Sequence, residues 1–430
     1  MESERFLRVR IALRNCGRNN TENTDRDTAG GYDGLRNALK MTPREVIEEI
    51  GKSGFRERSG NGFPVAEKWR LCLDASGSEK YVICNAAEGD PDSLIPRTLL
   101  EEDPWSVLEG MLIGAYAIGA TVGWIYIDAG YRAAINRGKA ALNQMEGLGL
   151  LGNRILDSKF SFRVEMREAP SNLACGDETF LINAMEDRKT LPFVCSSRLP
   201  IYGLGGKPTL VHNTETWTHV SAILQKGADW YANYGTDQCR GTKVFTLLGK
   251  MTHPGLIEVP MGTTLRQIVY GIGGGVPEGE DLKAGRVGGP TGGYLPAGSL
   301  DLPMDYEHLS ESGVLMGSGT LIVINDEACI VDHVKRSLSV IQGESCGKCV
   351  FCREGTMQMA EILSDIADGR GRSGDIELLI ELSEGLKKGS QCDLGREASN
   401  PVLTMIKYFG EELGAHIKEK RCTAQVCTMK

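Results

Sequence analysis

Residues 344–353 read Glu-Ser-Cys-Gly-Lys-Cys-Val-Phe-Cys-Arg, a short loop with the spacing C-x2-C-x2-C. A fourth cysteine follows in Ser390-Gln391-Cys392. Four thiolates are the usual ligand set of a [4Fe–4S] cubane, whereas zinc prefers paired C-x2-C knuckles. The sequence therefore predicts one [4Fe–4S] cluster held by Cys346, Cys349, Cys352 and Cys392. A four-cysteine zinc site and buried structural thiols are the alternatives.

The chain around this loop is almost wholly helical in its apolar spacing, with a Gly-rich break at residues 369–374. This pattern predicts an all-α bundle over residues 331–415. A second metal-ligand set lies in the tail, residues 416–430, where His416, Cys422 and Cys427 offer three zinc ligands. The fourth ligand would come from elsewhere or from a partner chain, and incidental thiols are the alternative.

In the region before the bundle, the spacing of hydrophobic residues changes twice. Residues 239–330 contain short strand-like runs at 243–248, 255–259 and 320–324, a helical run at 264–269, and Gly-rich turns, which predict a small α+β module. Residues 41–238 alternate between strand-like and helix-like segments and predict a parallel sheet covered by helices.

Particular elements of this α/β domain can be placed from the sequence. Strands are expected at 80–85, 124–127 and 162–166, and helices after Pro104 and over 132–145. Thr42 followed by Pro43 predicts the start of the first helix. Residues 1–40 have few apolar anchors and are expected to form an extended lead-in.

Composition narrows the class of protein. The chain has 430 residues, 41% of them hydrophobic, and a formal net charge of −9, which disfavours nucleic acid as a partner. We find no apolar run long enough for a transmembrane helix and no secretory signal in residues 1–10. The 13 cysteines, four of them in a metal-like pattern, favour a reducing compartment and thus the cytoplasm.

Four further motifs accompany the cysteine loop. They read Arg-Ser-Gly-Asn-Gly-Phe-Pro-Val-Ala-Glu-Lys-Trp at 58–69, Asn-Ala-Ala-Glu-Gly-Asp-Pro at 85–91, Ala-Cys-Gly-Asp-Glu-Thr at 174–179, and Lys-Pro-Thr-Leu-Val-His-Asn-Thr-Glu-Thr at 207–216. In this order they resemble the family of NADH dehydrogenase flavoprotein subunits (respiratory complex I). The resemblance is strongest to the flavin subunits of electron-bifurcating hydrogenases and transhydrogenases, and it covers roughly residues 46–426.

This resemblance implies a fold in three parts: a Rossmann-like α/β domain for FMN and NAD(P)H, a ubiquitin-like β-grasp module of the SLBB type, and a four-helix bundle carrying the [4Fe–4S] cluster. It also implies an electron-entry enzyme that passes electrons between NAD(P)H, FMN and the cluster, including in flavin-based bifurcating complexes. The residues implied in cofactor binding are Gly60, Gly62, Phe63, Lys68, Asn85, Glu88, Asp90, Gly176, Asp177, Glu178 and Asn213.

Elementary chemistry gives these residues distinct roles. Glycines let backbone N–H groups approach a phosphate closely, and Lys68 can neutralise it. Amide and acidic groups such as Asn85, Glu88 and Asn213 can hydrogen-bond the ribityl chain or the ring edge. In the family, the residues matching Phe63, Lys68, Asp90 and Glu178 contact the nicotinamide dinucleotide.

The motifs also depart from the family pattern. The positions concerned are Ser59, Asn61, Val65, Ala66, Ala87, Asp90, His212 and Phe351. Added side chains in a Gly-rich loop restrict φ and fill space where phosphate would lie. An alternative function is therefore an electron-relay or scaffold paralogue that keeps the cluster but has lost nucleotide binding. A regulatory nucleotide-binding module is a third alternative.

Partners are expected because bifurcating relatives often carry additional iron–sulfur domains. The chain begins at Met1 close to the core and ends at Lys430 without them. The resemblance therefore implies separate subunits: a small thioredoxin-like [2Fe–2S] chain and a larger iron–sulfur oxidoreductase chain.

Overall fold

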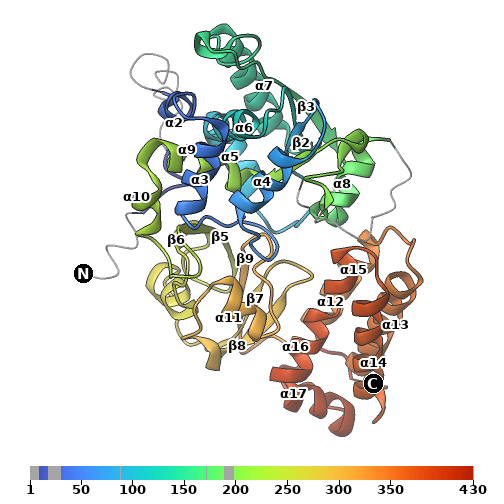
Figure 1. Ribbon diagram of the computed structural model, residues 1–430. Helices are drawn as coiled ribbons and strands as arrows, with labels where there is room; N and C mark the ends of the chain where they lie inside the picture. Colours follow the sequence, from blue (N-terminus) through green and yellow to red (C-terminus); the bar gives the residue numbers. More distant parts are fainter. Residues whose placement is uncertain (1–8, 18–30, 88, 171, 188–197, 430) are drawn as a thin grey trace.

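The computed structural model describes residues 9–17, 31–87, 89–170, 172–187 and 198–429 (Figure 1). Three parts follow one another along the chain. The first is an α/β domain, the second a smaller sheet module, and the third a group of helices that lies beside the first two in Figure 1. This order agrees with the expected fold class.

The α/β domain is built on a four-stranded parallel sheet with strand order β3-β2-β1-β4. The strands are β1 (Tyr81–Ala86), β2 (Val122–Asp128), β3 (Arg163–Ala169) and β4 (Thr209–Asn213). The three predicted strands are confirmed as β1, β2 and β3. We did not predict β4, a five-residue strand whose His212 and Asn213 break the apolar run.

Helices cover this sheet. They are α2 (Asp33–Ala38), α3 (Pro43–Lys52), α4 (Val65–Asp74), α5 (Ile95–Glu102), α6 (Pro104–Ile118), α7 (Arg132–Gly147), α8 (Glu178–Met185), α9 (Thr214–Lys226) and α10 (Ala228–Ala232). The predicted helices after Pro104 and over 132–145 are α6 and α7. In β1, Val82 and Cys84 face the core shared with α6 and α9, while Ile83 faces α8 and the C-terminal helices. Because side chains of a strand point alternately to its two faces, the sheet packs against α6 and α9 on one face and against α8 and the C-terminal helices on the other.

Thr42 caps α3 as the sequence predicts. Its side chain accepts from the Glu45 N–H, and the Glu45 carboxylate accepts from the Thr42 N–H at 2.7 Å, a complete capping box with Pro43 at the first helical position. We expect Thr42→Ala to lower the free energy of unfolding by about 1 kcal/mol, measured by chemical denaturation. Thr42→Ser, which retains the hydroxyl, should stay within a few tenths of the parent value.

The lead-in differs from expectation in the described segments 9–17 and 31–40. Ile11 and Ala12 are buried, and α2, which contains the buried Leu35, packs against α9. The Glu258 carboxylate, far along the chain, accepts from the backbone N–H groups of Ile11 and Ala12 at 2.8 and 2.9 Å. Such a long-range partner leaves no local sequence pattern.

The second part is a five-stranded mixed sheet with order β6-β5-β9-β7-β8. Its elements are β5 (Thr242–Gly249), β6 (Gly255–Pro260), a π-helical turn (Gln267–Ile272), β7 (Leu282–Val287), β8 (Gly293–Pro296), α11 (Tyr306–Glu311) and β9 (Thr320–Asn325). The predicted hairpin is confirmed as antiparallel β5–β6, and β9 pairs parallel to β5. The short strands β7 and β8, which contain glycine, were not predicted.

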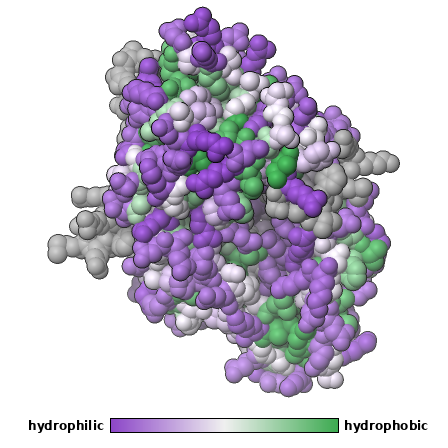
Figure 2. All heavy atoms as spheres, viewed as in Figure 1, coloured by the Kyte–Doolittle hydropathy of each residue, from purple (hydrophilic) through white to green (hydrophobic). Residues whose placement is uncertain are grey.

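The third part is helical. Its main helices are α12 (Ile330–Glu344), α13 (Val350–Ala367), α14 (Asp375–Gly389) and α16 (Asn400–Tyr408), with shorter α15 (Asp393–Glu397), α17 (Gly410–Gly414) and a π-helical turn (Ala415–Glu419). Contacts link α12 to α13, α13 to α14, α14 to α16 and α16 back to α12, which confirms a four-helix bundle. The predicted break at 369–374 separates α13 from α14. The face in Figure 2 is mostly hydrophilic, with a hydrophobic area over these helices.

Candidate functional site

The four predicted cluster ligands meet at one end of the helical bundle. Cys349 precedes the first residue of α13, Cys352 lies in its first turn, and Cys392 precedes α15. The Gln391 N–H donates to the Cys349 Sγ at 3.4 Å, which joins the Cys392 segment to the loop. Cys346 and Cys352 are also close enough to Cys392 to act on its charge. The structure thus places the four cysteines at the same end of the bundle, within electrostatic range of one another.

These thiols need a cation to ionise. Burial raises the pKa of Cys352, and it raises the pKa of Cys392 to about 12. At neutral pH both groups would therefore stay protonated without a bound metal, and iron would supply the positive charge that favours thiolate. The donor set fits a [4Fe–4S] cluster, with two N-terminal helix ends, α13 and α15, directed at its ligands.

Two adjoining clefts lie between the α/β domain, the sheet module and the cluster end of the bundle. They share Ser59, Gly60, Gly176, Asp393 and Glu397, and the larger has a volume of about 410 Å³. The predicted residues that line one or both clefts are Gly60, Gly62, Phe63, Lys68, Asp90, Gly176, Asp177 and Glu178. One site therefore contains residues from four separate segments, which are 58–69, 85–91, 174–179 and the segment after Cys392.

The two glycines of the loop serve different purposes. Gly60 has φ +54°, and a Cβ there would meet nothing within 4 Å, so its backbone is open to a ligand. Gly62 has φ +66°, and a Cβ there would lie 2.4 Å from the Tyr306 ring. Close packing of Tyr306 explains Gly62, whereas Gly60 offers the phosphate approach expected from the sequence.

The asparagines at the strand ends are used by the protein itself. Asn85 and Asn213 are register partners at the carboxyl ends of β1 and β4. The Asn213 Oδ1 caps α9 by accepting from the Thr216 N–H at 2.9 Å, and its Nδ2 donates to the Arg58 carbonyl at 3.3 Å. Neither asparagine is among the described residues that line the clefts. Glu88 lies outside the described residues.

Asp90 is held from the sheet module. Its carboxylate accepts from the Thr320 hydroxyl at 2.7 Å, from the Ser318 hydroxyl and from the Asp92 N–H. These bonds pin the β1 end of the cleft to β9. Asp90 therefore lines the site in a fixed orientation.

Lys68 lies at the centre of a buried ionic network. Its Nζ lies 2.8 Å from Glu57 Oε1 and 2.6 Å from Glu178 Oε1, and it donates to the Val211 carbonyl at 2.8 Å. Glu57 was not predicted from the sequence, and His212 was noted only as a departure from the family pattern. A carboxylate next to the Gly-rich segment was the available signal.

The network shifts the pKa values of its members. Burial opposes ionisation of Glu57, but Lys68 and His212 outweigh it and lower the pKa of Glu57 to about 2. Burial raises the pKa of Glu178 to about 7 against the attraction of Lys68. Burial also lowers the pKa of His212, which stays neutral at pH 7. Glu57 is thus the permanent counter-ion of Lys68.

The raised pKa of Glu178 predicts that the stability of the folded protein depends on pH. Its pKa is raised in the folded protein relative to an unfolded value of about 4.3, so the folded state binds more protons and stability falls as pH rises from about 4.5 through about 7. The charges that face it are Lys68, Glu57 and Asp177. We expect Glu178→Gln, a mimic of the neutral acid, to remove roughly 2 kcal/mol of this loss.

This dependence is measured by urea denaturation of both proteins between pH 5 and pH 8. The control is Glu186→Gln, the same substitution directly after the last turn of the same helix. An unchanged slope in Glu178→Gln would contradict the assigned titration.

The cleft adjoins the cluster segment, and a hydrogen bond to its backbone joins the two. The Asp177 carboxylate accepts from the Asp393 N–H at 3.2 Å, and Asp393 directly follows Cys392. Burial raises the pKa of nearby Glu397 to about 8. A cofactor in the cleft would therefore lie against the wall that carries a cluster ligand.

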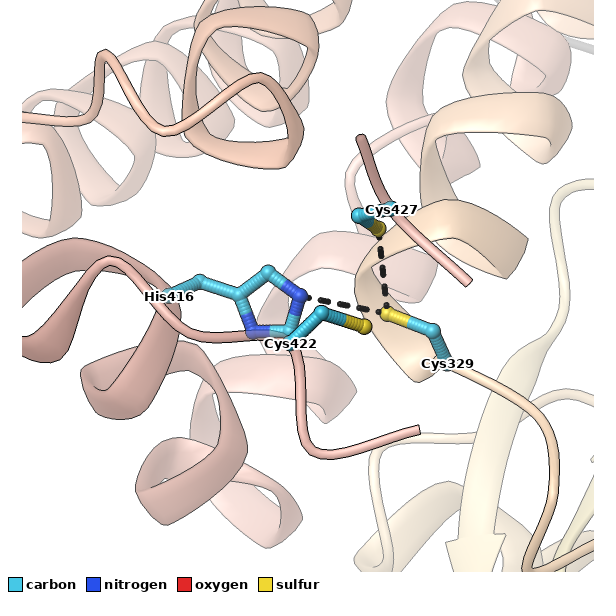
Figure 3. A group of neighbouring side chains, drawn as sticks. All are labelled: Cys329, His416, Cys422 and Cys427. Atoms are coloured by element: carbon cyan, nitrogen blue, oxygen red, sulfur yellow. Dashed lines mark hydrogen bonds between the residues drawn. The ribbon is translucent and has the colours of Figure 1, made fainter. Parts of the chain in front are cut away.

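The tail forms a second, closed donor set (Figure 3). Cys329, His416, Cys422 and Cys427 place one ligand atom each within 4.8 Å of one another. The Cys329 Sγ lies 3.3 Å from the His416 Nε2 and 3.6 Å from the Cys427 Sγ. These spacings are close to the edges of a zinc tetrahedron with bonds of about 2.0–2.3 Å. Cys329, at the start of α12, lies where a fourth ligand to the predicted tail set would be needed.

The surroundings of the tail set also suit a metal ion. The His416 Nδ1 lies 2.8 Å from the Glu412 carbonyl, which leaves the Nε2 free of its proton and directed at the sulfurs. Burial raises the pKa of Cys422, but backbone N–H groups of Cys427 and Val426 outweigh it and lower that pKa. The site therefore directs the His416 Nε2 at the sulfurs and favours at least one thiolate.

Similarity to known proteins follows the same division of the chain. Residues 50–222 match the Nuo51 FMN-binding domain, residues 244–294 the SLBB domain, and residues 332–416 the NADH-ubiquinone oxidoreductase-F iron–sulfur binding region. A parallel α/β domain, an SLBB module and a helical region with four converging cysteines define a flavin- and iron–sulfur-binding oxidoreductase subunit.

Individual relatives are similar over most of their length. The chain is 44% identical over 421 residues to the NADP-reducing hydrogenase subunit HndC of Solidesulfovibrio fructosivorans, covering 98% of this chain and 86% of that one. It is 37% identical to the F 2 subunit of NADH-quinone oxidoreductase of Rhizobium meliloti, covering 92% and 94%. It also matches a NAD+-reducing [NiFe]-hydrogenase structure with TM-score 0.82 and 30% identity, covering 93% of this chain and 67% of that one.

The chain therefore belongs to the family of NADH-quinone oxidoreductase F subunits and related hydrogenase subunits. Its relatives carry the name of subunits, so the family works in multi-subunit assemblies. None of the helices in the described part of the chain combines the length and apolar character needed to cross a bilayer.

Proposed function

We propose that this chain is the electron-entry subunit of a multi-subunit oxidoreductase, in which electrons pass between NAD(P)H, FMN and the [4Fe–4S] cluster. FMN supplies the conversion between the two-electron hydride and the single electrons that a cluster accepts. The observation that carries the proposal is the cleft of four segments whose wall, at Asp393, continues directly into cluster ligand Cys392.

The chain's own residues bind and orient. Gly60 presents open backbone to the cofactors, Gly176 lines both clefts, and Lys68 supplies positive charge. Phe63, 40% exposed at the cleft mouth, offers a ring for stacking on a nucleotide base. Asp90 and Glu178 are placed to accept from ribose hydroxyls. Asn85, Asn213, Asp177, Gly62 and Glu88 complete the proposed cofactor-binding set.

The metal assignments belong to the same proposal. Cys346, Cys349, Cys352 and Cys392 hold the [4Fe–4S] cluster, and His416, Cys422 and Cys427 hold zinc with Cys329. The proposed division is 1–40 lead-in, 41–238 FMN and NAD(P)H domain, 239–330 SLBB module, 331–415 bundle and 416–430 metal-binding tail.

Partners follow from the single cluster, which needs an onward electron acceptor. We propose a small thioredoxin-like [2Fe–2S] subunit and a larger iron–sulfur subunit, in the cytoplasm, where thiolate ligands persist. Val350 and Phe351 lie beside Cys349 and Cys352 and are 60% and 54% exposed. They offer an apolar contact surface to such a partner next to the cluster. The similarity to an NADP-reducing hydrogenase subunit supports a hydrogenase-type assembly, and we include electron bifurcation in the proposal.

A second candidate is an electron-relay or scaffold paralogue that keeps the cluster without binding nucleotide. One observation favours it: Lys68, the basic group deepest in the cleft, already has Glu57 and Glu178 as partners.

The test is anaerobic purification followed by quantification of iron, sulfide, flavin and zinc in one sample. The electron-entry function predicts about four iron atoms and one FMN per chain and bleaching of both absorbances by NADH or NADPH. Full iron content without flavin, and no response after FMN is added back, would instead establish the relay.

A further inference from the structure

Glu57 is an acidic side chain buried inside a site expected to receive anionic cofactors. Its carboxylate lines the larger cleft and is 10% exposed. Besides Lys68, its Oε1 contacts the His212 Nδ1 at 2.5 Å. Two separate elements, α4 through Lys68 and β4 through His212, therefore hold one carboxylate oxygen.

The charge on His212 follows from its other contact. The Trp69 indole N–H, which can only donate, lies 2.8 Å from the His212 Nε2, so that nitrogen accepts and carries no proton. The proton is then on Nδ1 and is donated to Glu57. His212 is neutral, and it contributes a hydrogen bond but no positive charge.

Acidic side chains outnumber basic ones around the two clefts. Among the described residues that line the two clefts, the basic ones are Arg56 and Lys68. The acidic ones are Glu57, Asp90, Asp177, Glu178, Asp393 and Glu397. Arg56 is itself paired with Glu307 at 2.5 Å and donates to the Gly62 carbonyl at 2.6 Å.

A phosphate-bearing ligand carries one to two negative charges and needs a cation or free N–H groups. In this cleft the cation available to a phosphate group is Lys68. Its charge is already neutralised by Glu57 in a buried, weakly screened setting. Binding such a ligand adds a like charge near Glu57, or requires Lys68 to break its bond with Glu57.

We propose that Glu57 is an internal anion that competes with the phosphate of FMN for Lys68 and so sets the affinity of the cleft for phosphorylated flavin. The inference rests on the proposed function, because it concerns the same cleft. It assigns a specificity-determining role to a residue outside the predicted cofactor set. His212 and Trp69 are its positioning residues, because they hold the carboxylate toward Lys68.

The test compares FMN with riboflavin, which has the same ring and no phosphate. Each is titrated against flavin-stripped, cluster-loaded protein, and binding is followed by quenching of flavin fluorescence. Glu57→Gln keeps the size of the side chain and can still accept from His212, but it removes the charge. We expect it to tighten FMN binding at least about tenfold and to change riboflavin binding less than about twofold.

The control variant is Glu57→Asp, which keeps the charge and should keep the FMN affinity of the parent. Iron content and circular dichroism verify that each variant is folded. If Glu57→Gln does not fold, Glu57→Ala takes its place with the same expectations. Unchanged or weaker FMN binding, or an equal gain for riboflavin, would overturn the proposal.

The outcome separates this inference from the proposed function. If the parent binds no FMN but the glutamine variant does, the inference holds and the chain as it stands is an electron relay. If the parent binds FMN tightly and the variant binds it no better, the electron-entry function stands and the role of Glu57 is refuted. If neither binds FMN, both are refuted.

Discussion

Cys352→Ala is expected to abolish the iron–sulfur cluster. Cys352 is buried in the first turn of α13 and lies within electrostatic range of the other three thiols. With one of four thiolates removed, an iron of the cubane loses its protein ligand and the cluster becomes labile. Iron and acid-labile sulfide should fall from about four atoms each per chain to less than one in anaerobically purified protein, with loss of the broad visible absorbance.

The matched control is Cys72→Ala, a fully buried cysteine of α4 that lies in the α/β domain and should leave the iron content unchanged. A full iron load in the Cys352 variant, or an equal loss in the control, would contradict the assignment. The same experiment on Cys392 tests whether the distant fourth ligand is required.

Loss of the tail metal should have the second largest effect. Cys329→Ala removes a ligand that joins α12 to the last residues of the chain. A structural zinc ion contributes roughly 10 kcal/mol or more to the folding of small domains, and it needs its full set of four ligands. We therefore expect the zinc content of the variant to fall from about one to near zero per chain. The Cys422 and Cys427 segment should then lose its protection from protease.

This result is measured by metal analysis and limited proteolysis, and the control is Cys16→Ala, a buried cysteine of the N-terminal segment. Iron content should be unaffected in both variants, because the two metal sites use different residues. Zinc retained at one per chain in the Cys329 variant would show that the tail set is not a zinc site.

Much of the fold was accessible from local patterns. Alternating and helical spacing located β1, β2, β3, α6, α7 and the bundle, because burial of one face imposes a period on each element. The start of α3 at Thr42 was equally visible, since its capping depends on residues only three positions apart. Strands β4 and β8 were missed because they are short and carry Gly or polar residues at buried positions, and β7 was missed because Gly285 interrupts its apolar pattern.

The candidate site divides in the same way. Cys346, Cys349 and Cys352 were recognisable because three ligands share one loop. Cys329 was not, because it lies 87 positions from His416 and stands next to no other ligand in the sequence. Glu57 was missed because a glutamate beside a Gly-rich loop is ordinarily solvated, and only the packing of α4 against β4 buries it.

By itself, the amino-acid sequence determined the order of the three parts, the four proposed cluster ligands and the family, since each depends on spacing within short segments. Tertiary structure alone decided which side chains contact one another. Only the folded chain shows that Lys68 is neutralised by Glu57, that His212 is neutral, and that Cys329 completes the tail set. The reason is physical. Ionic and metal-ligand contacts act over a few ångströms in space, and residues far apart along the chain reach that distance only after the core has packed.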